Sequence, residues 1–324
     1  MKHIIRSLPQ QIREAAQRAP KRRMRKGNLE QVLICGMGGS GISGEILKAL
    51  YPECHIIPNK AYSIPGYIDN RSLAIVISYS GNTEETLSNY TQLRRQNARI
   101  VTISSNGKLM RKKSEMKIRV PGGLPPRGAL GYLFTPLPGV LYTYHLIQTD
   151  PERTLLNCAS FLTQQRKKIE TRAKTISAKI VNHLPLIYAN SDVFLPVAKR
   201  WQCQLNENAK MLAHVNVFPE MNHNEIVGLG RPRQLNKRIV AVFLNDPSAH
   251  KRNRARVAIV KKIVSDMFSA VIDVQPQGNS RLQRMFWTIW LGDFVSYYCA
   301  VKSNVDPLPV ARIDYLKRKL TQLK

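Results

Sequence analysis

The stretch SYSGNTEE, residues 78–85, follows a short apolar run and precedes a segment of helical character. It carries three hydroxyl groups, on Ser78, Ser80 and Thr83, at offsets of two and three residues. Hydroxyl groups, together with the free N–H groups of a helix start, suit a phosphate monoester. An ordinary helix N-cap at Ser80 or Thr83 is the alternative. The stretch therefore predicts a phosphate-binding loop between a strand and a helix.

A second, glycine-rich loop lies upstream in CGMGGSGISGE, residues 35–45. The glycines at 36–41 permit a tight strand-to-helix turn, and Ser40 stands near the start of the helix. Such a turn presents main-chain N–H groups and the positive end of the helix dipole to an anion. We expect Gly39 and Ser40 to contribute to the same phosphate site as residues 78–85.

The same loop also matches the pattern G-x-G-x-x-G, at Gly36, Gly38 and Gly41, which is typical of dinucleotide-binding domains. Binding of NAD requires an acidic residue at the end of the second strand, where this chain has Pro-Asn-Lys at 58–60. This argues against NAD. Lys60 leaves an NADP-linked enzyme as an alternative.

Short runs rich in Val and Ile alternate with helical stretches along both halves of the chain, which is typical of parallel sheets covered by helices. A length of 324 residues exceeds the usual size of one hydrophobic core. We therefore predict an α/β protein of two domains, residues 1–150 and 151–324, each with a mainly parallel sheet flanked by helices. The expected strands lie near 32–35, 55–58, 73–78, 100–104, 116–120, 184–189, 239–244 and 270–275.

Three helical segments complete the expected organisation. Residues 1–20 form an amphipathic helix, and one long apolar helix runs from about residue 131 to 148, where Asp150-Pro151 ends it. The chain closes with two helices joined across residues 304–309.

The composition excludes several classes of protein. No uncharged apolar run approaches the roughly 20 residues that a membrane-spanning helix needs, and the N-terminal segment lacks the apolar core of a secretory signal. The five cysteines stand singly, without CxxC spacing, and the histidines and carboxylates show no metal-ligand spacing such as HExxH. We expect a cytoplasmic protein that binds no metal.

The charge is strongly basic: 50 Lys and Arg residues against 21 Asp and Glu give +29, which attracts polyanions. Local clusters lie at 21–26, 111–113, 251–256 and 317–319. No helix-turn-helix, RNA-recognition or zinc-finger pattern accompanies them. We expect non-specific contact with nucleic acid, and a dedicated nucleic-acid-binding protein stays open as an alternative.

Five segments follow one another along the chain: GMGGSGISGE, ISYSGNTEET, PPRGALG, NENAK and MNHNEIVG. In this order they resemble the sugar-isomerase (SIS) family, in particular its bifunctional phosphoglucose/phosphomannose isomerases, over nearly the whole chain. The resemblance implies two SIS domains and an enzyme that interconverts fructose 6-phosphate with glucose 6-phosphate and/or mannose 6-phosphate through an enediol, without a cofactor. It also implies a homodimer whose active site is completed by a histidine of the neighbouring subunit. A non-catalytic phosphosugar sensor is the alternative.

The resemblance also implies roles for three side chains. Glu207, in NENAK, is the base that moves a proton between C1 and C2. A surface ion pair between Glu207 and Lys210, three residues apart on a helix, is the alternative. His223, in MNHNE, is the acid/base that opens the sugar ring. Arg127, in PPRG, faces the reacting carbons and stabilises the enediolate.

A lysine on the C-terminal helix is the remaining catalytic group that the resemblance implies. Lys317 is the candidate, with Lys302 and Lys319 as neighbouring alternatives. Leu308 stands near a position where relatives often carry Thr, which leaves the choice between glucose and mannose phosphates open.

Overall fold

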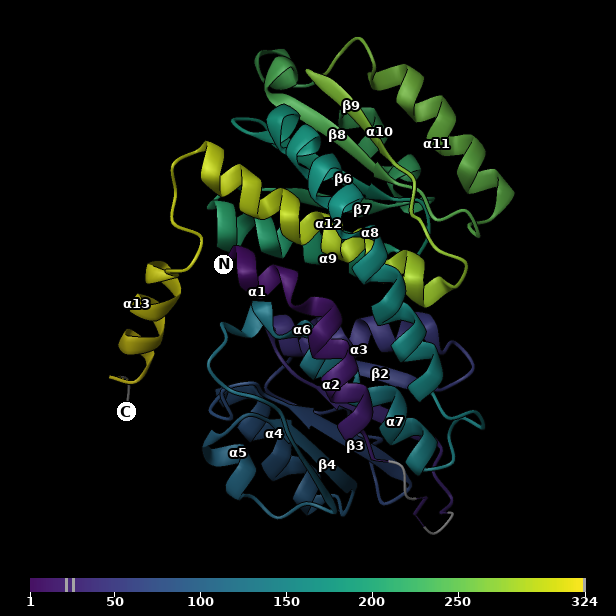
Figure 1. Cartoon of the computed structure of the whole chain (residues 1–324), viewed down its shortest axis with the longest axis vertical. Coiled ribbons are helices and arrows are strands. Elements are labelled where there is room, and N and C mark those ends of the chain that lie inside the picture. The colour runs from purple at the N-terminus through teal and green to yellow at the C-terminus, as the bar shows by residue number, and fades with distance from the viewer. Residues whose placement is uncertain (21–22, 25–26, 323–324) are drawn as a thin grey trace.

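The computed structural model describes residues 1–20, 23–24 and 27–322. Two parallel sheets lie at opposite ends of the molecule with a layer of helices between them, and further helices cover the outer faces (Figure 1). The predicted α/β class with two parallel sheets is confirmed. Of the basic cluster at 21–26, residues 21, 22, 25 and 26 lie outside the described residues.

The first sheet has the strand order β2-β1-β3-β4-β5 and is parallel throughout. All residues of β1 and β3 are buried, which explains why both read as continuous apolar runs. Each strand lies within one residue of its predicted bounds. In spatial order the strands are β2 (Ile56–Asn59), β1 (Gln31–Cys35), β3 (Ser72–Ile77), β4 (Arg99–Ser104) and β5 (Met116–Arg119).

The second sheet has the order β7-β6-β8-β9 and is also parallel. Three of its strands were predicted. The fourth, β7, was not predicted; it is a four-residue edge strand that alternates polar and apolar residues and is only partly buried. The strands are β7 (His214–Val217), β6 (Leu184–Ala189), β8 (Ile239–Leu244) and β9 (Ala270–Val274).

The helices fall into three groups. α4 (Glu84–Arg95) packs on the outer face of the first sheet, and α11 (Lys251–Val264) packs on the outer face of the second. One apolar cluster fills the space between the sheets. It includes side chains from α2 (Leu8–Arg18), α3 (Gly38–Leu50), α6 (Leu130–Phe134), α7 (Pro136–Thr143), α8 (Glu152–Ile180), α9 (Leu195–Gln204) and α12 (Arg281–Lys302).

The remaining helices are short or peripheral. The amphipathic N-terminal segment forms α1 and α2, which are separated at Ser7. Among the described residues, no helix is both long enough and apolar enough to cross a bilayer. The division at residue 150 stays a prediction. The other helices are α1 (Lys2–Arg6), α5 (Gly107–Arg111), α10 (Glu225–Gly228) and α13 (Ala311–Leu320).

The single helix predicted for residues 131–148 is wrong. The segment forms two helices, α6 and α7, because Pro136 has no N–H to continue the first helix and instead starts the second. The second helix ends at Thr143, before His145, which has a positive φ of 63°. The apolar character of the segment was read correctly, since α6 is buried throughout.

A buried ion pair ties this helical layer together. Arg200 on α9 donates from Nε and Nη2 to the Asp293 carboxylate on α12 over 3.0 and 2.8 Å, and both side chains are buried. Nη2 of Arg200 also donates to the main-chain oxygen of Arg127 over 3.0 Å. The pair therefore connects the first half of the chain to two helices of the second half.

Replacement of Asp293 by Ala leaves the Arg200 charge buried and unpaired, so we expect the free energy of unfolding to fall by about 3–5 kcal/mol. Urea denaturation measures this change. Asp314→Ala, on the exposed helix α13, is the control and shifts stability by less than about 0.5 kcal/mol. A loss below about 1 kcal/mol in Asp293→Ala would contradict the role of the pair.

Candidate functional site

The loop after β3 is held in shape by its own hydroxyl groups. The Ser78 oxygen accepts from the N–H groups of Gly81 (3.1 Å) and Thr83 (3.4 Å), and lies 2.8 Å from the Thr83 hydroxyl. The main-chain N–H of Asn82 donates to the Ser80 hydroxyl, which is exposed. Gly81 has φ +71°, and a Cβ there would lie 1.8 Å from the main-chain oxygen of Asn106. Only glycine fits this turn.

Thr83 is the residue at the N-cap of α4, but its hydroxyl makes no capping hydrogen bond to the helix. The Thr83 side chain therefore does not act as an ordinary N-cap. The hydroxyl instead joins Ser78. The start of α4, with its uncapped N–H groups and dipole, is thus presented beside the hydroxyls of the loop, an arrangement that suits an anion.

The glycine-rich loop lies directly behind this turn. The buried Ser40 hydroxyl accepts from the main-chain N–H of Tyr79 over 3.4 Å, so the two loops touch. Gly39 packs against the segment that carries Arg127: a Cβ at Gly39 would lie 2.9 Å from the main-chain oxygen of Pro126 and 3.5 Å from Cα of Arg127. The two loops, which were predicted from separate patterns, are thus in contact. The glycine-rich loop also packs against the segment that carries Arg127, the predicted catalytic arginine.

Arg127 lies on the 3-10 turn η1 (Pro126–Gly128) and is 5% exposed. Its Nε donates to Oδ1 of Asn208 over 2.7 Å. Its Nη2 donates to the main-chain oxygens of Pro307 (2.6 Å) and Leu308 (2.8 Å). Nη1 faces Oε2 of Glu207 at 3.5 Å. Burial lowers the pKa of Arg127 from its ordinary value while the Glu207 carboxylate raises it, and the guanidinium stays charged.

Glu207 lies on a single turn of π-helix, η2 (Leu205–Ala209), which continues α9. Such turns often occur at functional sites. The turn ends at Lys210, which has a left-handed φ of 56°. Nζ of Lys210 donates to the main-chain oxygens of Glu207 (2.6 Å) and Pro309 (2.7 Å). The Lys210 ammonium therefore bonds the main chain of Glu207, while the Glu207 carboxylate faces Arg127.

Asn208 was not named in the sequence analysis, and Lys210 was named there only as an alternative ion-pair partner of Glu207. Both belong to the NENAK segment, and their position beside Glu207 was the available signal. Burial and the nearby Arg127 charge lower the pKa of Lys210 from its ordinary value. The side chains of Arg127 and Lys210 together hold residues 307–309 beside the π-turn through hydrogen bonds to their main-chain oxygens.

His223 ends the 3-10 turn η3 (Glu220–His223), and its ring is exposed. The segment is anchored by Glu225, whose carboxylate accepts from the Tyr188 hydroxyl (2.6 Å) and lies 2.9 Å from Nε2 of His214. Burial raises the pKa of Glu225, but hydrogen bonds from Asn216, Tyr188 and His214 outweigh it, so the net shift is downward. In the part of the chain that the structure describes, no hydrogen bond joins His223 to Arg127 or Glu207.

Lys317 is likewise not joined to Glu207 by any hydrogen bond or ion pair among the described residues. It lies on α13, which has no buried residue and stands apart from both sheets (Figure 1). The neighbouring Lys319 lies over the Tyr315 ring, 5.9 Å from its centroid. One chain therefore brings Arg127 and Glu207 together with the phosphate-type loops, and leaves His223 and Lys317 at its surface.

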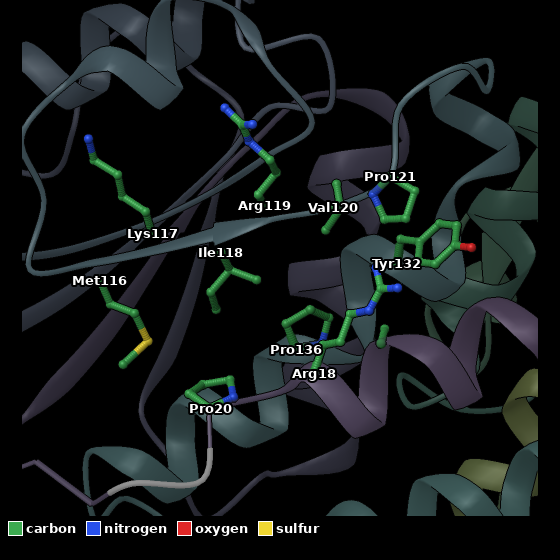
Figure 2. Close-up of a pocket in the computed structure, with 11 residues that line it drawn as sticks. Arg18, Pro20, Met116, Lys117, Ile118, Arg119, Val120, Pro121, Tyr132 and Pro136 are labelled. Atoms are coloured by element: carbon green, nitrogen blue, oxygen red, sulfur yellow. The ribbon is translucent and has the colours of Figure 1, made fainter.

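Two cavities differ in their relation to this cluster. A cavity of about 520 Å³ opens between the π-turn and the start of α13, and Glu207, Lys210, Leu212 and Ile313 help to line it. A smaller cavity of about 230 Å³ lies at the free edge of β5. Figure 2 shows the side chains that line the smaller cavity, and none of the predicted site residues is among them.

Neither a metal site nor an NADP site is favoured by the side chains. In residues 1–20, 23–24 and 27–322, no three His, Cys, Asp or Glu side chains gather as a metal site would need. The Lys60 ammonium, on which the NADP alternative depends, is paired with the Glu45 carboxylate.

Two family models match the chain: a SIS domain at residues 28–123, and the bacterial phospho-glucose isomerase C-terminal SIS domain at residues 169–320. Among solved structures, the C-terminal domain of glucosamine-fructose-6-phosphate aminotransferase from Francisella tularensis has a TM-score of 0.72 at 16% identity, covering 94% of this chain and 96% of that one. Tagatose-6-phosphate ketose/aldose isomerase from Escherichia coli has a TM-score of 0.68 at 14% identity, covering 94% of each chain. The molecule is therefore a double-SIS protein.

Closer relatives define the family within that class. A bifunctional phosphoglucose/phosphomannose isomerase from Caldicellulosiruptor bescii is 40% identical over 98% of both chains. One from Thermoplasma volcanium is 35% identical over 91% of this chain and 92% of its own. This chain belongs to the bifunctional phosphoglucose/phosphomannose isomerase family.

Substitution of Gly39 by Ala tests the contact between the glycine-rich loop and Arg127. The added Cβ meets main-chain atoms that cannot rotate away, and overpacking of this kind costs about 1–3 kcal/mol. We expect fructose 6-phosphate to bind at least about tenfold more weakly, as measured by titration calorimetry. Gly66→Ala is the matched control, because a Cβ at Gly66 has no atom within 4 Å. Equal binding by both variants would contradict the predicted role of Gly39.

Proposed function

We propose that this chain interconverts fructose 6-phosphate with glucose 6-phosphate and mannose 6-phosphate in the cytoplasm, as an aldose-ketose isomerase. The observation that carries the proposal is the approach of a buried guanidinium to a partly exposed carboxylate: Nη1 of Arg127 lies 3.5 Å from Oε2 of Glu207, whose side chain is 29% exposed. This pair lies next to two loops that suit a phosphate. The names of the relatives supply the substrates.

The loops fix the position of the substrate before any bond changes. The hydroxyls of Ser78, Ser80 and Thr83, with Gly39, Ser40 and the start of α4, hold the phosphate group. Ser78 and Ser40 also keep the two loops in shape. Because Gly39 packs against Pro126, the sugar chain of a bound hexose phosphate extends from these loops toward Arg127 and Glu207. Anchoring at one end converts the proton transfer into an intramolecular event.

Glu207 moves the proton. In the direction from aldose to ketose, its carboxylate takes the proton from C2, the C–H electron pair forms the C1–C2 double bond, and O1 gains a proton to give the enediol. The same carboxyl group then delivers the proton to C1, O2 loses its proton, and C2 becomes the carbonyl carbon. Negative charge develops on O1 or O2 in between. Arg127 stabilises that charge, since its guanidinium is already oriented and desolvated.

We further propose that His223 of a neighbouring copy supplies the acid/base group that opens the sugar ring, and that Lys317 assists near the carbons. This requires a homodimer. The proposal is supported by the exposure of His223, by the absence of any hydrogen bond from it to Arg127 or Glu207 among the described residues, and by the uncovered helix α13. Imidazole is suited to ring opening near neutral pH.

Glu207→Gln keeps the shape of the site and removes the base. We expect kcat with fructose 6-phosphate, in the presence of EDTA and without nucleotide, to fall by about 10³-fold or more, while binding of fructose 6-phosphate changes by less than about threefold. Enzymatic detection of the aldose formed, combined with calorimetry, measures both quantities. Full activity in the variant would overturn the assignment of Glu207, and a wild-type protein that binds but never isomerises would favour a phosphosugar sensor.

Mixing two inactive variants tests the shared site. In a heterodimer of Glu207→Gln and His223→Ala, one of the two sites contains an intact Glu207 and an intact His223 only if the histidine crosses between subunits. After dissociation and random reassociation, activity is expected to return to about a quarter of the wild-type value. Each variant alone, treated in the same way, stays inactive. No recovery in the mixture would show that each chain uses its own histidine.

A further inference from the structure

A chain of buried hydrogen bonds runs from the Arg127 guanidinium into helix α12. Asn208 accepts from Nε of Arg127 over 2.7 Å and donates from Nδ2 to the Ser296 hydroxyl over 3.0 Å. Ser296 in turn donates to the main-chain oxygen of Asp293 over 2.8 Å. The Asn208 and Ser296 side chains are fully buried. Each polar group in this chain is therefore shielded from water and has a specific partner, which makes its orientation costly to change.

The same series of hydrogen bonds holds both the main chain and the side chain of Arg127. Arg200, held by Asp293, donates to the main-chain oxygen of Arg127, while Asn208 accepts from the side chain of the same residue. A guanidinium has five N–H groups. Three of them are engaged by Asn208, Pro307 and Leu308, and these are the groups on Nε and Nη2. Nη1 is left to face the Glu207 carboxylate.

We infer that Asn208 is a positioning residue for the isomerisation. Its side-chain amide holds Nε of Arg127 so that Nη1 points at the Glu207 carboxylate and at the oxygen that becomes negative in the enediolate. This inference rests on the proposed function, because it assigns Asn208 to the same proton transfer. Asn208 does not touch the substrate and acts through Arg127.

The position of Asn208 in the π-turn explains why this one residue can orient both the Arg127 guanidinium and the Glu207 carboxylate. Glu207 and Asn208 are neighbours in the chain, so the residue that holds the guanidinium also fixes the backbone that carries the base. Without the Asn208 oxygen, Nε loses its acceptor in a buried site, where an unpaired donor is unfavourable. We expect the guanidinium to rotate until Nε finds another acceptor, so that Nη1 no longer points at the oxygen that becomes negative in the enediolate.

Asn208→Leu, a change of similar size, tests the inference. We expect kcat to fall by about 100-fold, the range found when one preorganised donor to a developing oxyanion is lost, while KM changes by less than about threefold. Binding of the stable enediolate analogue 5-phospho-D-arabinonate weakens in parallel with kcat, whereas binding of sorbitol 6-phosphate, which lacks the planar anionic group, does not. Asn208→Asp, which keeps an acceptor for Nε, recovers most of the lost kcat.

Asn89→Leu is the matched control for damage to folding. Asn89 is a buried asparagine with hydrogen bonds to the main-chain oxygens of Ala61 and Tyr62, outside the network around Arg127. It is expected to lower thermal stability and to leave kcat per folded molecule unchanged. If Asn208→Leu does not fold, Ser296→Ala removes the acceptor of the Asn208 amide, together with one hydrogen bond to the main-chain oxygen of Asp293, and kcat is expected to fall several-fold at unchanged KM.

Three outcomes would overturn the inference: an Asn208→Leu protein with wild-type kcat, a rise in KM without a fall in kcat, or an Asn208→Asp protein that is folded and as slow as Asn208→Leu. Arg127→Gln, measured in parallel, separates this failure from failure of the proposed function. If Arg127→Gln is inactive while Asn208→Leu is fully active, only the role of Asn208 is lost. If Arg127→Gln is fully active, the proposed role of Arg127 is lost as well.

Discussion

The structure around the site depends on a buried arginine, Arg127, whose hydrogen bonds join the π-turn to the loop before α13. The Arg127 guanidinium is 5% exposed, and burial of a positive charge is unfavourable unless it is paired and hydrogen-bonded. Its partners come from the π-turn, through Asn208 and Glu207, and from the loop before α13, while its own segment packs against Gly39. The guanidinium thus holds the Glu207 carboxylate and the C-terminal loop together, while the main chain beside it packs against the glycine-rich loop.

Much of the fold could be predicted because the central strands of both sheets are buried on both faces. In β1, β3 and β8 the apolar run itself marks the strand, and the observed bounds differ from the predicted ones by no more than one residue. Prediction failed at one edge strand and inside one apolar helical segment. β7 is a short edge strand with alternating polarity, and Pro136 divides a helix that hydropathy alone reads as continuous.

In the candidate site, the parts formed by local sequence could be predicted, and the contacts between residues far apart in the chain could not. The two glycine- and hydroxyl-rich loops are local, so their sequence carries the turn geometry and predicts the loops directly. The partners of Arg127 are not local. Asn208 lies 81 residues away along the chain and Leu308 lies 181 residues away, and their contacts with Arg127 arise only when α9, α12 and the C-terminal loop pack together. Among the described residues, no hydrogen bond or ion pair joins His223 or Lys317 to Glu207, and their roles stay predictions.

The central claim is that Arg127, held from behind, presents Nη1 together with the Glu207 carboxylate to the carbons of a sugar whose phosphate is anchored at residues 78–83. A crystal structure of the protein with 5-phospho-D-arabinonate tests it most directly. We predict the phosphate group at Ser80 and Thr83, and the carboxylate of the analogue within hydrogen-bonding distance, about 3 Å, of Nη1, with Nε still bound to Asn208. An analogue bound in the cavity at the edge of β5, or one that leaves Arg127 and Glu207 without contact to it, would contradict the account.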